Sequence, residues 1–336
     1  MKKSIVLPVL AGIMVLSVWG CENKEQEKAE ADTGIEAAAD QKKEQPKESQ
    51  ENGSGLSFED FRNVEFVFCS GVGGWQTSLT IGEDGSFSGL FFDGNMGDIG
   101  EGYPNGSILW SEFSGRFTPP VQEDANTYSV QIEALEYKEQ IGTEEIQDEM
   151  RYCYTDAYGL DGTKTIRIHV PGAPLEQISE EARNWIGYYD LSQTTDTTLS
   201  FYVLENEQQG YGFRGFDMVE ELRKTIVYTE RQVAEQEESI QKEMLSQTEL
   251  TEKTGYIYNL WDQALNSTWD VLKKTLDAET MEALTVEERR WIDQKEAAVI
   301  EAGAEFEGGS LQPMAMNDMA AKLTKARVYE LLEWLE

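Results

Sequence analysis

The sequence contains one histidine, His169, among its 336 residues. Any Ser/His/Asp or Cys/His catalytic site would have to use this imidazole. Alternation along Thr165 to Val170 puts Arg167 and His169 on the polar face of a strand, so we expect an exposed histidine. No Cys-x-x-Cys pair is present, which argues against zinc chemistry. We therefore assign no catalytic residue and no cofactor.

Positive charge is scarce, with 28 Lys and Arg residues against 63 Asp and Glu residues, a net charge of −35. Such a surface repels phosphate backbones, which excludes nucleic acid as a partner. It also repels anionic lipid headgroups. We expect a cationic partner instead, such as a basic protein or peptide.

The first 21 residues have the composition of an export signal. Lys2 and Lys3 precede an apolar run from Ile5 to Trp19, which is too short for a comfortable membrane span. The ending Val18-Trp19-Gly20-Cys21 resembles a bacterial lipoprotein lipobox. The resemblance implies cleavage before Cys21 and lipidation of Cys21, which would hold the protein on the extracytoplasmic face of the membrane by lipid alone. An ordinary signal peptide with an incidental cysteine is the alternative.

Cysteine is also scarce, since only Cys69 and Cys153 remain beside Cys21. Both lie in strand-like segments. An exported location permits a disulfide between them, and two buried thiols are the alternative.

Residues 22–56 are rich in Glu, Lys, Gln and Ala and hold almost no large apolar residue. Such a stretch buries too little surface to offset its ordering entropy. We expect a disordered acidic tether.

Residues 57–216 read as an all-β domain. Short apolar runs alternate with Gly, Asp, Asn and Pro turns, which predicts an antiparallel β-sandwich or small barrel. The expected strands are 64–68, 77–81, 86–92, 107–117, 127–137, 150–154, 163–170 and 199–204.

Residues 217–336 change to a helical period and lose nearly all Gly and Pro before Gly303. Apolar residues recur three and four positions apart, as in Leu265, Trp269, Leu272 and Leu276. We expect a bundle of three to four helices, so the whole chain is a multidomain all-β plus all-α protein.

The helical half resembles the LprI-like lysozyme-inhibitor N-terminal domain over roughly residues 245–335. The motif residues that carry the likeness are Asp262, Leu265, Asn266, Trp269, Trp291 and Arg327, with Gly308-Gly309-Ser310 between the last two. The resemblance implies an exported helical module. Lys253 and Val299 stand about where the family has cysteines, and Trp269 replaces its usual Tyr. We therefore expect packing, and no disulfide, to hold these helices.

Contacts within this motif are also expected. We predict that Trp269 packs against Trp291 and that Arg327 pairs with an acidic neighbour such as Asp262. The acidic residues Glu287, Glu288, Asp293 and Glu296 are expected to form a solvated face that would steer a cationic target.

The middle part resembles an uncharacterised Firmicutes lipoprotein domain, through Ser70-Gly71-Val72-Gly73-Gly74-Trp75 and Tyr103-Pro104-Asn105-Gly106. That family implies no known activity. The acidic loop Asp93, Asn95, Asp98 and Glu101 is the best local binding candidate, and its oxygens make it a weak Ca²⁺ candidate. A plain hairpin connection is the simpler interpretation.

Three functions remain open. The first is a cell-surface, non-enzymatic binding module, with lysozyme or another cationic envelope-active protein as its target. The second is a solute- or Ca²⁺-binding lipoprotein that uses the loops of the β domain. The third, an envelope hydrolase with an unrecognised carboxylate pair, has the least support.

Overall fold

The computed structural model describes residues 55–71 and 73–336. The expected signal segment, Cys21 and nearly all of the expected tether lie outside these residues. Within the described part, no helix is long and apolar enough to cross a membrane.

The β region is a closed barrel of eight antiparallel strands. The strands of the barrel follow the order β6-β9-β10-β11-β1-β2-β3-β4, and β4 pairs with β6 to close the ring. This closure decides between the sandwich and the barrel. The bounds are β1 (Val64–Cys69), β2 (Trp75–Ile81), β3 (Ser86–Asn95), β4 (Ser107–Phe117), β6 (Thr127–Tyr137), β9 (Thr165–His169), β10 (Val203–Asn206) and β11 (Tyr211–Asp217).

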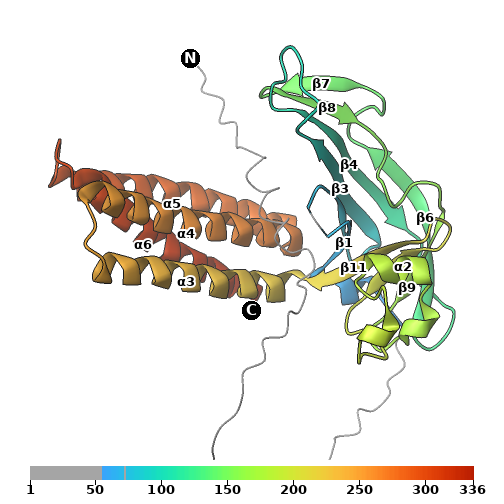
Figure 1. Cartoon of the computed structure of the whole chain (residues 1–336). Helices are drawn as coiled ribbons and strands as arrows, with labels where there is room; N and C mark the ends of the chain where they lie inside the picture. The colour runs from blue at the N-terminus through green and yellow to red at the C-terminus, as the bar shows by residue number, and fades with distance from the viewer. Residues whose placement is uncertain (1–54, 72) are drawn as a thin grey trace, which may run out of the picture.

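Three short strands extend the sheet beyond the barrel. The first half of β4 pairs in parallel with β8 (Met150–Tyr154), which pairs in turn with β7 (Glu144–Gln147). Strand β5 (Val121–Gln122) adds to β6. Figure 1 shows the β7–β8 pair at the far end of the sheet, at the top of the view.

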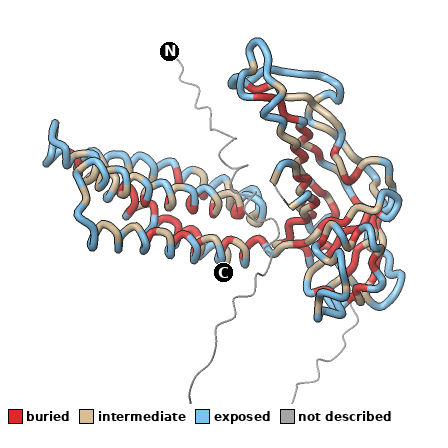
Figure 2. The backbone as a smooth tube through the Cα atoms, in the orientation of Figure 1, coloured by how far each residue is buried: buried red, intermediate tan, exposed pale blue. Residues whose placement is uncertain are grey.

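The interior of the barrel is packed with side chains, most of them aromatic or branched aliphatic. Phe66, Phe68, Ile166, Ile168 and Phe213 are fully buried there. Figure 2 shows the buried backbone concentrated along the barrel strands. A filled barrel of this size offers its loops and outer surface for binding.

Residues 170–202 form a small layer over the outer face of β9, β10 and β11. It contains η3 (Leu175–Gln177), α2 (Glu180–Trp185) and η4 (Leu191–Gln193), and it has its own apolar cluster around Leu175, Ile186 and Val203. A Cβ at Gly212 of β11 would lie 2.5 Å from the carbonyl oxygen of Ala182. Glycine there allows α2 to approach the sheet closely.

Four long helices follow: α3 (Met218–Lys242), α4 (Gln247–Thr275), α5 (Ala278–Ala304) and α6 (Gln312–Leu332). They confirm the expected helical bundle (Figure 1). Helices α4 and α6 pack most extensively, while α3 lies on α4 and α5 on α6. Asp217, Ser246 and Asp277 cap the first three through side-chain acceptors.

The barrel and the bundle are joined without a linker. Asp217 ends β11 and is also the N-cap of α3, and the Met218 N–H donates to the Asn63 carbonyl at 2.8 Å. A second tie joins Lys274 of α4 to Glu65 of β1 at 2.7 Å, with the Glu65 side chain only 6% exposed. A buried carboxylate needs such a cation, so this pair favours one placement of α4 on the barrel.

Candidate functional site

Arg327, one of the motif residues, lies on the face of α6 toward α5 and is surrounded by acidic side chains. We define the Arg327 cluster as Arg327, Glu287, Glu288, Glu330 and Trp291. The Nε of Arg327 donates to Oε2 of Glu288 at 2.8 Å, while Nη1 donates to Glu330 at 3.1 Å and lies 2.8 Å from Glu287. The guanidinium also lies 5.8 Å from the centroid of the Trp291 ring.

Burial within this cluster is uneven. The side chains of Arg327 and Glu288 are 5% and 11% exposed, whereas Glu287 and Glu330 are 55% and 59% exposed. One buried ion pair therefore fixes a guanidinium that orients two exposed carboxylates. The prediction that Glu288 belongs to a solvated face is wrong. The packing of α5 on α6 buries this residue against Arg327.

Arg327 has acidic partners, as predicted, but the suggested Asp262 is not one of them, because all three carboxylates come from α5 and α6. Asp262 instead accepts hydrogen bonds on its own helix, from the Tyr258 hydroxyl and the Asn266 amide, both at 3.4 Å. Lys295 of α5 lies 3.5 Å from that tyrosine hydroxyl and 5.0 Å from the Trp291 ring centroid. Contacts through Tyr258, Lys295 and Trp291 thus link Asp262 indirectly to the Arg327 cluster.

The remaining motif residues are structural. Leu265 is buried in the bundle core, and Trp269 and Trp291 pack at its edge as partly buried residues. Among the described residues no ring contact joins these two tryptophans, contrary to the prediction. The ring contact found in the bundle is instead between Trp261 and Tyr329, at 6.1 Å.

The acidic loop after β3 is stabilised by contacts of its own. Asp98 accepts hydrogen bonds from the Ser107 hydroxyl at 2.6 Å and from Arg151, and these bonds hold the pKa of its carboxyl below the ordinary range. The Asn95 side chain accepts from the Gly97 N–H at 3.1 Å. Asp93 lies in β3 opposite Leu109, and Glu101 is exposed.

This arrangement leaves few free oxygen ligands for a cation. Asp98 already has a guanidinium partner, and the described residues contain no group of three or more His, Cys, Asp or Glu side chains suited to a metal. A Ca²⁺ site needs six to eight oxygens free to turn inward. The loop's geometry therefore supports a hairpin connection.

Cys69 and Cys153 are both thiols and both half-buried. Of the two alternatives that the sequence leaves open, the structure therefore has the pair of thiols. Burial, helped by the nearby carboxylate of Glu144, raises the pKa of the Cys153 thiol.

His169 is buried, contrary to the prediction, although its strand face was assigned correctly. The layer of residues 170–202 covers the outer face of β9 at this position, which a strand pattern alone does not reveal. His169 Nε2 lies 2.7 Å from Oε2 of Glu205, whose Oε1 accepts from the Ser179 N–H at 3.2 Å. Burial opposes ionisation of Glu205, but these hydrogen bonds outweigh it and hold the pKa of its carboxyl below the ordinary value.

Thr127 completes a hydroxyl–imidazole–carboxylate sequence, with Oγ1 3.5 Å from His169 Nδ1. The order matches that of a nucleophilic triad. All three residues are buried, however, so no substrate reaches the hydroxyl. The arrangement serves to attach the covering layer to the barrel, and Glu205 was missed because a lone Glu in a strand carries no sequence signal.

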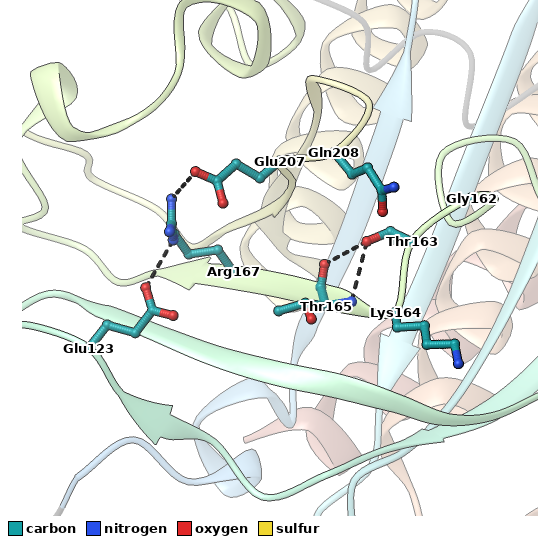
Figure 3. A pocket seen from close by; sticks show the side chains of 8 residues that line it. All are labelled: Glu123, Gly162, Thr163, Lys164, Thr165, Arg167, Glu207 and Gln208. Carbon is teal, nitrogen blue, oxygen red and sulfur yellow. Dashed lines mark hydrogen bonds and ion pairs between the residues drawn. The ribbon is translucent and has the colours of Figure 1, made fainter.

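Among the described residues, two shallow hollows are lined by charged side chains. Figure 3 shows the first, of about 810 Å³, where Arg167 bridges Glu123 and Glu207 at 3.0 and 2.6 Å beside Lys164. The second, of about 850 Å³, lies between the barrel wall and the α4–α5 turn and is lined by Arg62, Asp84, Arg116 and Lys274 among others. In the second hollow, Arg116 is paired with Asp84 and Lys274 with Glu65.

Comparison with known proteins places the helical motif in context. The family described as lysozyme inhibitor LprI matches residues 238–331, which include the end of α3, all of α4 and α5, and nearly all of α6. An uncharacterized protein of Rhizobium meliloti (strain 1021) is 29% identical over 116 residues, which is 31% of this chain and 84% of that protein. No solved structure matches the chain.

Proposed function

We propose that the helical bundle is a binding module for a basic protein of the lysozyme type. The observation that carries this proposal is the coincidence of the lysozyme-inhibitor match with the Arg327 cluster, since residues 238–331 contain all five of its residues. The family is described by inhibition, which fits a binding module and no enzyme.

The charge of the chain supports the same partner. A net charge of −35 attracts cationic proteins over long distances and raises association rates by roughly ten- to a thousandfold at low salt. Within the module, Arg327 holds the carboxylates of Glu287 and Glu330 in place before binding. Carboxylates that are already ordered lose less side-chain entropy on contact with a basic surface.

The place of action is also part of the proposal. We infer export and lipidation at Cys21, which would tether the module outside the membrane where lysozyme attacks the wall. The support is the sequence pattern of residues 1–21. A Cys21→Ala chain should lose incorporation of a radiolabelled fatty acid and leave the membrane fraction; lipid incorporation into that variant would contradict the assignment.

The binding test uses hen lysozyme immobilised on a sensor surface. We expect saturable binding of the purified chain at low salt, with an association rate that falls steeply as salt is added. A Glu287→Gln, Glu330→Gln double variant should bind more slowly. The matched control is a Glu83→Gln, Glu123→Gln variant, which makes the same charge change on the barrel.

Three outcomes would contradict the proposal. They are no retention at low salt, retention insensitive to salt, and equal slowing by the bundle and barrel variants. The last would reduce the effect to net charge, with no role for the Arg327 cluster.

No particular observation on the described residues favours the Ca²⁺-binding or the hydrolase alternative. In the acidic loop, Asp98 is already paired with Arg151.

A further inference from the structure

The end of the bundle farthest from the barrel carries exposed apolar side chains. Figure 1 shows the α3–α4 turn and the α5–α6 turn at this end, and the Gln247 amide of α4 contacts the Met314 sulfur of α6 at 3.9 Å. We define the distal tip as residues 243–246 and 300–311. Its exposed large apolar residues are Met244, Ile300, Phe306 and Leu311.

The charged side chains of the distal tip all have one sign. They are Glu243, Glu301, Glu305 and Glu307, and all four are exposed. No Lys or Arg occurs between Lys295 and Lys322. Lys242, which ends α3, is paired with Glu238. The apolar side chains of the tip are therefore bordered by carboxylates alone.

The α5–α6 turn is held in shape by its own hydrogen bonds. The Gly309 N–H donates to the Phe306 carbonyl at 2.8 Å. The Gly308 N–H donates to the Gln312 side chain at 3.0 Å, and its φ of 72° is one that glycine adopts without strain. Phe306 and Leu311 thus lie on an ordered turn, which lowers the entropy cost of docking.

The opposite end of the bundle is occupied by the barrel. Lys274, near the end of α4, pairs with Glu65 of β1, and the Met218 N–H at the start of α3 donates to Asn63. Helix α4 has 29 residues, so the distal tip lies about 43 Å from this junction. Both turns of the tip fall within residues 238–331, which match the lysozyme-inhibitor family. Within the described residues, the tip is the end of the matched region that the barrel leaves uncovered.

We propose that the distal tip is the docking surface for a basic protein, with Phe306 and Leu311 entering an apolar hollow bordered by Lys and Arg. This inference rests on the proposed function, in which the bundle binds such a protein. Charge selects this occupant, because the four glutamates repel both an anionic membrane and the equally acidic tip of a second copy. A cationic protein instead pairs with them around the apolar contact, as in an interface with an apolar core and a polar rim.

The distal tip and the Arg327 cluster should affect different rates. Arg327 lies 15 residues after Gln312, the first residue of α6, so about 22 Å separates the cluster from the tip along this helix. The exposed carboxylates of the cluster steer the approach of a cationic partner and act on the association rate. Apolar contacts made at the tip act on the dissociation rate.

The test compares tip variants of the full-length chain on immobilised hen lysozyme. The double variant Phe306→Ser, Leu311→Ser keeps every charge, so we expect dissociation to be about tenfold faster or more and association to change less than about twofold. Val227→Ser, Tyr228→Ser is the matched control, because it removes two exposed apolar side chains from α3 and should bind as the natural chain does. Glu305→Gln, Glu307→Gln should slow association and weaken its salt dependence.

Failure of this inference can be told apart from failure of the proposed function. If the natural chain does not bind lysozyme, both are wrong. If it binds and the Phe306→Ser, Leu311→Ser variant dissociates at the natural rate, or no faster than the α3 control, the docking surface is wrong while the function stands. Loss of a concentration-dependent dimer or of vesicle binding in this variant, with lysozyme binding unchanged, would assign the tip to a second copy or to lipid and would overturn the inference.

Discussion

The buried ion pair of the Arg327 cluster gives the sharpest test of how the bundle is held together. Arg327→Met removes the guanidinium and keeps an apolar stem of similar length. Glu288, whose side chain is 11% exposed, then has no cation. Glu287 and Glu330 are more than half exposed and return to water.

The expected cost follows from these exposures. Removing one partner of a buried ion pair costs about 3–5 kcal/mol, because the other charge stays uncompensated. Each exposed pair contributes at most about 1 kcal/mol. Water reaches Glu288 in part, so we expect the free energy of unfolding to fall by about 3 kcal/mol.

Urea unfolding followed by helical circular dichroism measures this change. Lys322→Met is the matched control, since it removes the same charge from an exposed position on α6 and should stay within about 0.5 kcal/mol of the natural chain. The double variant Glu288→Leu, Arg327→Met should recover most of the loss, because an apolar pair replaces the charges without leaving either one alone.

Two results would refute this reasoning. A loss below about 1 kcal/mol for Arg327→Met would mean that water reaches Glu288 freely. A double variant no more stable than the single one would mean that the packing of the guanidinium matters more than the charge of Glu288.

Three further predictions concern the β region and its ion pair with α4. Asp148 and Glu149, in the turn between β7 and β8, have φ values of 50° and 65°, a left-handed conformation that glycine adopts without strain. Glu149→Gly should therefore raise the free energy of unfolding by about 1 kcal/mol, measured by urea unfolding, while Glu149→Ala should not. Lys274→Met should lower the free energy of unfolding by about 2 kcal/mol in the same assay, because Glu65 stays buried without its cation. An unchanged urea midpoint would contradict this. The pKa of Asp98 is held low in the fold, so its stabilisation is present above its ordinary pKa and is lost as the pH falls through the lowered value. Melting temperatures should therefore fall more steeply in acid for the natural chain than for Asp98→Asn, and parallel curves would contradict the assignment.

Local patterns determined most of the elements. Alternation and turn residues predicted β1, β2, β3, β4, β6, β8 and β9 close to their observed bounds, because strand pairing preserves a period of two. Strand β11 falls in residues 211–217, where Gly212 and Gly215 interrupt the alternation and no strand was expected. The helical period after residue 217 predicted a bundle of three to four helices, and four long ones formed.

Contacts between segments far apart in the chain could not be predicted from the sequence. The two halves of β4 pair with different strands, and this shared strand closes the barrel. His169 was placed on the correct face of its strand, yet residues 170–202 fold back over that face. Arg327 was expected to have an acidic partner, but an acidic chain offers many, and the packing of α5 on α6 selected Glu288.

The sequence by itself determined where the chain alternates, where it turns helical and how strongly it is charged, because these depend on neighbours along the chain. The tertiary structure alone decided that the sheet closes, that His169 is buried against Glu205 and that Trp75, Tyr158, Trp185 and Tyr211 gather around Phe68. Each of those outcomes depends on side chains far apart in the sequence being brought within a few ångströms, and one-dimensional spacing contains no measure of that distance.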